Sequence, residues 1–307
     1  MKLKYFNKLL EYSKSGKLPL ILLLSPFFLD GKKKNLEILR QKINYSIHKT
    51  LKRKYMNKKI GNDVSFSSSK KKNLKNPIWF MWLQGIEDAP ELCKVNFNRI
   101  SRTHSERMNL ITADTLEEYL DLPEFILKKW KKGIITNTHF SDIVRVQLLT
   151  TYGGTWVDST VFVSDTLLEF DEDFLIPQTF KPGRDGNVIP VSSWYIHAGE
   201  KNEYMIRVRD LLFYYWQKHD YLIDYFLLHH FLIIASEEMQ DYLDCIKPLD
   251  NTLPHLLMLR MRRYDISKDE FLTYFKNLKL MKFTNKAQNE REKNNYNKMI
   301  NLLKGEN

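Results

Sequence analysis

The pattern of apolar and polar positions predicts alternating strands and helices from residue 77 onward. Residues 77–85 are almost wholly apolar and end in a polar residue and a glycine, which is typical of a buried strand that leads into a loop. Residues 91–103 suit a helix, and residues 108–112 form a second short strand. This alternation predicts an α/β fold with a single, mostly parallel sheet of Rossmann type, flanked by helices. In such sheets, ligands bind at the carboxyl ends of the strands.

A helix is predicted over residues 139–152 and a strand over residues 155–163. Asn137 and Thr138 are candidate N-cap residues, and Gly153 supplies the positive φ that commonly ends a helix. The strand is rich in β-branched and aromatic residues.

The two-residue period of that strand places Trp156, Asp158, Thr160 and Phe162 on one face. A carboxylate and a hydroxyl therefore lie together, shortly after a glycine turn at Gly154 that would let a ligand approach the backbone.

The C-terminal half is predicted to be mostly helical. Residues 204–216 and 221–235 are too continuously apolar for surface helices, so they are expected to pack on the sheet. Residues 285–307 are polar apart from a short apolar run at 299–303, and they are expected to form a C-terminal tail that frays.

The N-terminal region has a different pattern. Residues 18–29 are apolar but number only 12, whereas a membrane-spanning helix needs about 20. Residues 35–60 predict an amphipathic helix, and residues 61–72 are the best linker candidate. The apolar positions of the helix are Leu36, Leu39, Ile43, Ile47 and Leu51. We therefore expect three parts: a basic helical region (1–75), a catalytic-type α/β domain (76–284) and a tail (285–307).

The charge of the chain is concentrated in the first of these parts. The chain carries 48 Lys and Arg and 37 Asp and Glu, a net charge of +11, but residues 1–75 alone carry +16 and the remainder −5. Such a region attracts an anionic membrane surface or nucleic acid. Because it lacks interleaved aromatic stacking residues, we expect no nucleic acid partner. Contact with a membrane and a buried helix surrounded by solvated lysines both remain open.

Composition excludes several classes of protein. A chain of 307 residues with 43% hydrophobic residues can bury a sizeable core, which excludes disordered and fibrous proteins. Two cysteines cannot form a disulfide framework, and they favour a reducing compartment such as the cytoplasm.

Candidate chemistry lies between Asp142 and Asp158. Asp142 and Arg145 share one helix face, a diglycine follows, and Asp158 completes the set within 17 residues. A buried charge needs a partner, and a divalent cation with a phosphate ligand would supply one. The alternatives are an intrahelical ion pair and a structural aspartate that caps a turn.

These residues carry a resemblance to a known family. Ser141-Asp-Ile-Val-Arg145, Leu148-Leu149, Tyr152-Gly-Gly154 and Trp156-Val-Asp158 resemble the core of the DxD-type, sugar-nucleotide glycosyltransferases of GT-A fold. The specific resemblance is to the capsular polysaccharide synthesis protein family, akin to the mannosyltransferase-like group with a sugar-binding DxD motif. It covers roughly residues 76–235, and residues 1–75 lie outside it.

The resemblance implies roles for individual residues. Trp82, Leu83 and Gln84 would line the nucleotide pocket. The alternative is that Trp79 and Trp82 are core residues of a buried strand. Gly154 and Trp156 would belong to the donor site. Asp142 and Arg145 would contact the sugar or the phosphates of the donor.

Asp158 matches the first aspartate of the DxD motif and would hold Mn²⁺ or Mg²⁺ on the donor diphosphate. The second acid of the motif is replaced by Thr160, which leaves a thin ligand set. His230 is a candidate further ligand, although a histidine on an apolar helix is more often a core residue. Residues 192–197 could shape an acceptor site or form an ordinary strand.

The implied function is transfer of a hexose from a nucleoside diphosphate sugar to a lipid-linked oligosaccharide in capsule or cell-surface polysaccharide synthesis. By the resemblance, the reaction would be metal-dependent and retaining, with Asp158 and Arg145 as catalytic residues, at the inner face of the cell membrane. A non-enzymatic basic module that binds a membrane or nucleic acid is one alternative, and a phosphosugar transferase is another.

Overall fold

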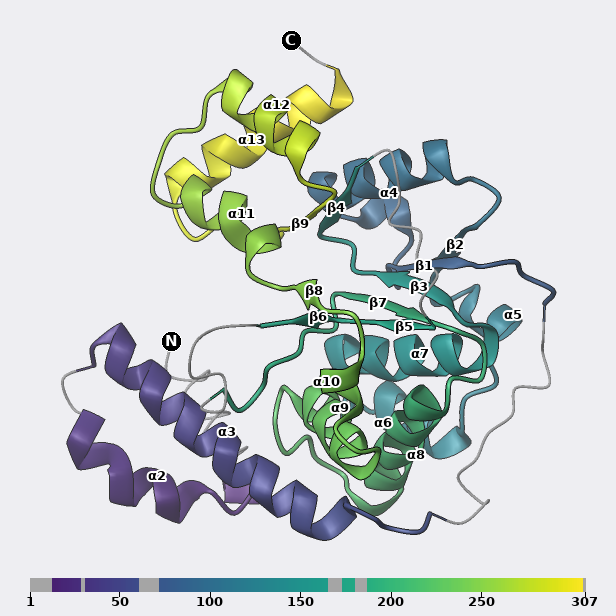
Figure 1. The fold of residues 1–307 in the computed structure, drawn as a ribbon, viewed down its shortest axis with the longest axis vertical. Coiled ribbons are helices and arrows are strands. Elements are labelled where there is room, and N and C mark those ends of the chain that lie inside the picture. Colours follow the sequence, from purple (N-terminus) through teal and green to yellow (C-terminus); the bar gives the residue numbers. More distant parts are fainter. Residues whose placement is uncertain (1–12, 29–30, 61–71, 165–172, 180–186, 306–307) are drawn as a thin grey trace.

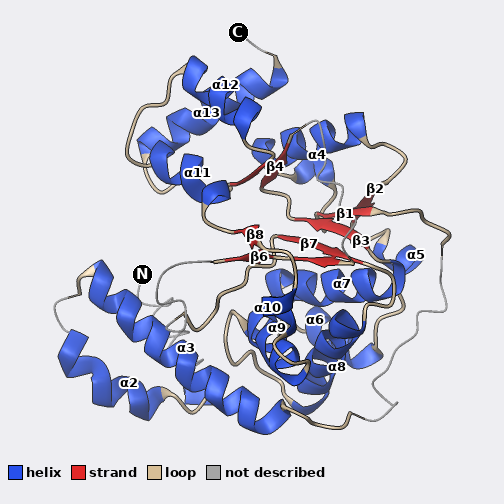
Figure 2. Cartoon of the chain, in the orientation of Figure 1, coloured by secondary structure: helices blue, strands red, loops and turns tan. Residues whose placement is uncertain are grey.

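The structure is a computed structural model that describes residues 13–28, 31–60, 72–164, 173–179 and 187–305 (Figure 1). A five-stranded sheet lies at its centre, and helices cover both faces (Figure 2). The predicted linker at residues 61–72 lies outside the described residues, except for Lys72.

The central sheet has the strand order β2-β1-β3-β7-β5. Its strands are β1 (Ile78–Met81), β2 (Met108–Ile111), β3 (Gly154–Val157), β5 (Phe174–Leu175) and β7 (Tyr195–Ala198). β1 pairs in parallel with β2 and β3, while β7 runs antiparallel between β3 and β5. Four of the five strands in this described sheet therefore share one direction, which confirms the predicted α/β class with a mostly parallel sheet.

Both faces of the sheet are buried because side chains alternate along each strand. On β1, Trp79 packs into the larger core, while Ile78 and Phe80 pack into a smaller core with Ile100. The larger core lies under α6 (Glu124–Lys131), α7 (Asn137–Tyr152), α8 (Glu203–Lys218) and α9 (Leu227–Glu238), and α4 (Glu91–Thr103) covers the opposite face. The predicted helix over residues 91–103 is confirmed.

Two predicted helices have different boundaries. α7 begins two residues before the predicted body, and its N-cap is Thr136, whose side chain accepts a hydrogen bond from the His139 amide. It ends at Gly153 with φ +65°, as predicted. α9 begins at Leu227, so residues 221–226 precede the helix rather than form part of it.

The predicted strand over residues 155–163 is wrong as a single element. β3 ends at Val157, residues 158–160 form a turn closed by a hydrogen bond from Val161 N to Asp158 O, and β4 (Val161–Val163) follows. The break arises because the two halves pair with different partners. β3 pairs with β7, whereas β4 pairs antiparallel with β9 (Leu280–Lys282) in a separate two-stranded sheet.

The C-terminal segment is a packed helix and not a fraying tail. α13 (Glu290–Lys304) buries Glu292, Asn295, Tyr296 and Met299, which lie on one face at spacings of three and four. The polar members are satisfied: Arg262 pairs with Glu292 at 3.0 Å, and Asn295 donates to two backbone carbonyls. The sequence pattern concealed this face because half of it is polar.

The remaining described elements are short. α11 (Leu256–Met261) and α12 (Lys268–Asn277) pack with α13 around a second apolar core, here called the C-terminal layer. The others are α5 (Leu116–Tyr119), α10 (Tyr242–Cys245), β6 (Pro177–Gln178), β8 (Leu249–Asp250) and the 3-10 turns Ser25–Phe28, Ile86–Asp88 and Leu253–His255.

The N-terminal region contributes to the main core. α2 (Leu18–Leu24) buries no residue, but α3 (Lys33–Tyr55) inserts Ile43, Ile47 and Leu51 into the same core as the sheet. A domain boundary at residue 75 therefore does not separate two cores. None of the helices in the described ranges is long and apolar enough to cross a membrane.

Polar contacts also fix α3 to α9. His48 Nδ1 lies 3.3 Å from His230 Nδ1, and Lys52 pairs with Glu237 at 2.9 Å. Burial, followed by the positive charges that His230 and Lys52 can contribute, lowers the pKa of His48 from 6.5 to about 4. His48 is therefore neutral in the folded protein near pH 7.

This pKa predicts a loss of stability in acid. Between about pH 6.5 and pH 4 the unfolded chain binds a proton at His48 that the folded chain does not, so the free energy of unfolding falls as the pH falls. In His48→Asn, the loss between pH 7 and pH 5 should be smaller than in the wild type by roughly 1–2 kcal/mol. Urea unfolding at both pH values measures this difference, and equal losses in the two proteins would contradict it.

Candidate functional site

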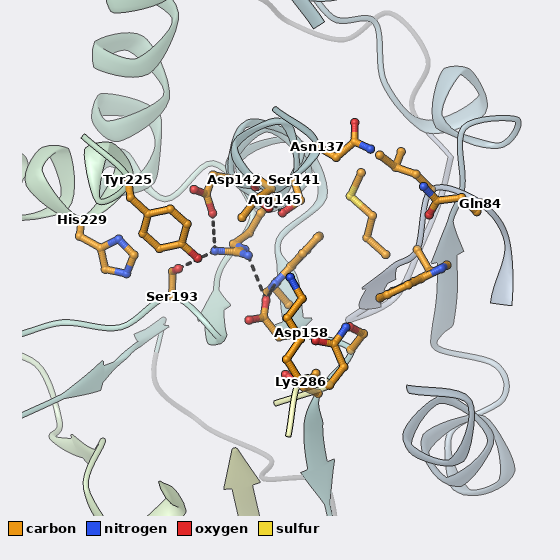
Figure 3. A pocket seen from close by; sticks show the side chains of 18 residues that line it. Gln84, Asn137, Ser141, Asp142, Arg145, Asp158, Ser193, Tyr225, His229 and Lys286 are labelled. Atoms are coloured by element: carbon orange, nitrogen blue, oxygen red, sulfur yellow. Dashed lines mark hydrogen bonds and ion pairs between the residues drawn. The ribbon is translucent and has the colours of Figure 1, made fainter. Parts of the chain in front are cut away.

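A cavity of about 450 Å³ opens where the carboxyl ends of β1 and β3 meet the N-terminal half of α7 (Figure 3). This is the position at which parallel sheets bind ligands. Its wall is completed by residues near the start of β7, around the start of α9 and after β9. The lining residues are Met81, Trp82, Leu83, Gln84, Asn137, Thr138, Ser141, Asp142, Arg145, Trp156, Asp158, Ser159, Thr160, Ser193, Tyr225, His229, Asn285 and Lys286.

Arg145 lies at the centre of this cavity and joins three elements. Its Nη1 donates to Asp142 Oδ1 at 2.9 Å and to Ser193 Oγ at 2.6 Å, and its Nη2 donates to Asp158 Oδ1 at 3.0 Å. The Asp142 contact is the predicted intrahelical pair, but the other two reach the strand turn and the start of β7. Only 5% of the arginine side chain is exposed, so the guanidinium serves mainly to position these three groups.

Trp156 supports the same cluster. Its ring lies under the guanidinium, with Arg145 Cζ 4.7 Å from the ring centroid, and its Nε1 donates to Asp158 Oδ1 at 2.8 Å. A cation over an indole face gains about 0.5–2 kcal/mol. Trp156 therefore contacts both the guanidinium of Arg145 and the carboxylate of Asp158.

Asp142 is oriented from behind by α8. Trp216 Nε1 donates to His139 Nε2 at 2.9 Å, which leaves the ring proton of His139 on Nδ1. That nitrogen lies 3.4 Å from Asp142 Oδ2 but makes no hydrogen bond with the described residues. Arg145 therefore provides the hydrogen bond that fixes Asp142, and His139 lies beside the second carboxylate oxygen.

Lys282 completes the cluster from β9. Its Nζ donates to Asp158 Oδ2 at 2.9 Å and to Thr160 Oγ1 at 2.7 Å. The sequence analysis missed this lysine because it lies 124 residues after Asp158. Only the register of β4 and β9, which pairs Val161 with Lys282, brings it to the turn.

Asp158 is consequently a strongly stabilised carboxylate. Burial is the largest influence and raises its pKa, but the charges of Lys282 and Arg145 and the hydrogen bonds from Trp156 and Lys282 together outweigh it. The pKa falls from 3.8 to about 2. Asp158 is ionised throughout the physiological pH range.

The side chains at the cavity do not fit the expected Mn²⁺ or Mg²⁺ site. Both oxygens of Asp158 accept hydrogen bonds from cations, and Thr160 Oγ1 accepts from Lys282. His230 is fully buried outside the cavity, where its Nε2 lies 3.2 Å from Asp224 Oδ2, so it is not placed as a ligand. The described residues hold no group of three His, Cys, Asp or Glu side chains suited to a metal ion.

The neighbouring histidine, His229, lines the cavity instead. Its Nδ1 is buried and has no hydrogen-bond partner among the described residues. Burial lowers the pKa of His229 from 6.5 to about 4, so the ring is neutral near pH 7. It offers a bound molecule a hydrogen-bonding group without charge.

The loop after β1 forms part of the cavity wall. Trp82 N donates to Ile111 O at 3.0 Å, and Ala113 N donates to Leu83 O at 2.9 Å, so the end of β2 holds the loop in place. Trp82, Leu83 and Gln84 all line the cavity. Trp82 Nε1 is buried without a partner among the described residues, which marks it as a donor for a ligand.

Gly154 does not line the described cavity. Its φ is +91°, and a Cβ at this position would lie 2.1 Å from Pro77 O. The glycine therefore permits close packing of β3 against the chain before β1, rather than close approach of a ligand.

The cluster predicts that Asp158→Asn destabilises the protein. The substitution leaves Lys282 and Arg145 without their shared counter-charge, so the free energy of unfolding should fall by about 1–3 kcal/mol. Asp265→Asn is a matched control, because Asp265 is 74% exposed and 3.8 Å from Arg291, and it should change stability by less than about 0.5 kcal/mol. Urea unfolding at pH 7 measures both, and unchanged stability in Asp158→Asn would contradict the network.

Comparison with known proteins places the chain in a family. No curated protein matches it. Among solved structures, it is similar to a chain called "PaToxG Glycosyltransferase", with a TM-score of 0.41 and 12% identity over 87% of this chain and 98% of that chain. Residues 30–302 match the family described as capsular polysaccharide synthesis protein, so the match includes α3 and the C-terminal layer and extends beyond residues 76–235. The chain belongs to the capsular polysaccharide synthesis protein family.

Proposed function

We propose that this protein is a glycosyltransferase that moves a hexose from a nucleoside diphosphate sugar to a saccharide acceptor in capsule or cell-surface polysaccharide synthesis. The cavity at the ends of β1 and β3 carries the proposal, because it combines a fixed charged cluster with polar groups that have no hydrogen-bond partner among the described residues. Family membership supports the same activity.

The charges of the cavity favour an anionic donor. Arg145 and Lys282 balance Asp142 and Asp158, and Lys286 adds a further positive charge on the lining. Fixed positive groups at a departing diphosphate stabilise the negative charge that develops there.

The uncharged groups suit the rest of the donor. Gln84 lies on the opposite side of the cavity from Tyr225 and His229 (Figure 3). Gln84 and the neighbouring Trp82 would bind the nucleotide, while Tyr225 and His229 would face the sugar or the acceptor. Retention of configuration enters this proposal through the resemblance alone. Both carboxylates of the described lining are ion-paired with Arg145, which argues against a free carboxylate nucleophile among them.

A nucleotide-sugar screen tests this function. Hydrolysis of a panel of nucleoside diphosphate sugars needs no acceptor, and the same donors should raise the melting temperature by binding the folded state. Stabilisation by oligonucleotides alone would instead favour a non-enzymatic basic module, and transfer of a sugar phosphate would favour a phosphosugar transferase.

Arg145→Lys should reduce donor hydrolysis by at least ~100-fold, because one ammonium cannot hold Asp142, Ser193 and Asp158 in the planar arrangement of a guanidinium. The matched control is Arg260→Lys, which alters an arginine–glutamate pair in the C-terminal layer and should leave turnover unchanged. Steady-state hydrolysis of the best donor measures both. Normal turnover in Arg145→Lys would exclude this cluster as the reaction centre.

We also propose that the N-terminal helices hold the enzyme at an anionic membrane surface, close to a lipid-linked acceptor. Leu22, Leu23 and Phe27 are 62%, 71% and 76% exposed. The adjoining face of α3 carries Lys42, Lys49 and Arg53. Apolar side chains beside cations match the acyl boundary and the headgroups of an anionic bilayer.

The membrane proposal predicts that Leu23→Glu weakens sedimentation with vesicles of anionic lipid, and that wild-type binding falls as salt rises. Leu272→Glu, at a 48% exposed position on α12, is the control and should bind like the wild type. Point variants are used rather than a chain that lacks the N-terminal helices, because removing α3 would expose the main core to solvent. Equal binding by Leu23→Glu and the wild type would refute the proposal.

A further inference from the structure

Lys282 occupies the place that the DxD resemblance assigns to a divalent cation. Its ammonium group lies between the first and third side chains of the motif, 2.9 Å from Asp158 Oδ2 and 2.7 Å from Thr160 Oγ1. Its side chain is 17% exposed, so it is held within the protein rather than free in solvent. The ammonium group of the chain itself therefore bridges these two oxygens.

A divalent cation would have to displace this lysine. Asp158 Oδ2 is engaged by Lys282, and Asp158 Oδ1 by Arg145 and Trp156. A doubly charged ion at Asp158 would also lie close to the positive charges of Lys282 and Arg145, which repel it. The replacement of the second acid by Thr160 agrees with this arrangement, because a neutral hydroxyl accepts a hydrogen bond from an ammonium group while adding no charge to attract a metal.

The ammonium group retains bonding capacity for a ligand. It has three N–H donors, and its contacts with described residues use two of them. The acceptors are Asp158 and Thr160, which both line the cavity. Arg145, by contrast, commits three of its five N–H donors to Asp142, Ser193 and Asp158. Lys282 is not itself a lining residue of the described cavity, as Arg145 is, but it keeps one N–H donor for a diphosphate that lies against Asp158 and Thr160.

We propose that Lys282 is a catalytic residue that replaces the divalent cation, and that the enzyme transfers its sugar without a metal ion. The inference rests on the proposed glycosyltransferase function. The bond between the anomeric carbon and the β-phosphate oxygen breaks, and its electron pair stays on that oxygen. Lys282 stabilises the resulting charge. A hydroxyl oxygen of the acceptor bonds to the anomeric carbon, and its proton leaves with the diphosphate.

The first test measures turnover in the full chain. After treatment with EDTA, wild-type hydrolysis of nucleotide sugars should stay within about twofold of the rate with added Mn²⁺. Lys282→Met keeps the length of the side chain but removes the charge, and it should lower turnover by at least ~100-fold. Lys279→Ala removes an exposed lysine three residues earlier and should have no effect. Loss of wild-type turnover in EDTA with recovery in Mn²⁺ would overturn the proposal.

The second test measures metal binding without a donor. Titration calorimetry with Mn²⁺ alone should detect no Asp158-dependent binding in the wild type, whereas Lys282→Met, which frees oxygens of Asp158 and Thr160, should gain it. Wild-type binding of Mn²⁺ that disappears in Thr160→Ala or Asp158→Asn would overturn the proposal, whatever the activity. If no nucleotide sugar is hydrolysed under any condition, the proposed function fails, and the titration still decides whether Lys282 replaces the metal.

Discussion

The shared ion pairing of Asp158 is the interaction on which the site depends. Arg145 approaches this carboxylate from α7 and Lys282 from β9, so three elements that are distant in the sequence meet at one pair of oxygen atoms. Removing either cation would leave this mostly buried carboxylate with only one positive partner, which is more costly than the loss of a surface pair. The ion pairing of Asp158 therefore both holds the elements around the cavity together and balances the charges within it.

Local periodicity accounts for the parts of the fold that the sequence predicted correctly. α4 buries a mostly apolar stripe and β1 is apolar on both faces, so the sequence pattern predicts them. The end of α7 at Gly153 follows from a backbone angle that few other residues adopt. The same reasoning singled out Asp142, Arg145 and Asp158, because they lie at or near the ends of such elements, whereas Trp82 was named through the family resemblance.

The failures have a common physical cause, which is pairing over long sequence distances. The turn at residues 158–160 forms because β4 finds β9, and α13 packs because Glu292 and Asn295 find partners on other elements. No window of neighbouring residues contains that information. The prediction of His230 as a ligand is wrong for a related reason, because only the rotation of α9 relative to the sheet brings the adjacent His229 to the cavity instead.

The pairing of β4 with β9 also sets the order in which the site is assembled during synthesis. When Asp158 leaves the ribosome, Arg145 is already present, but Lys282 follows only after another 124 residues have been added. Contacts of such long separation close late in folding, because the entropy of the intervening loop must be overcome first. A nascent chain therefore holds an incomplete charge cluster until the C-terminal layer docks, and the cluster is completed together with the finished fold rather than before it.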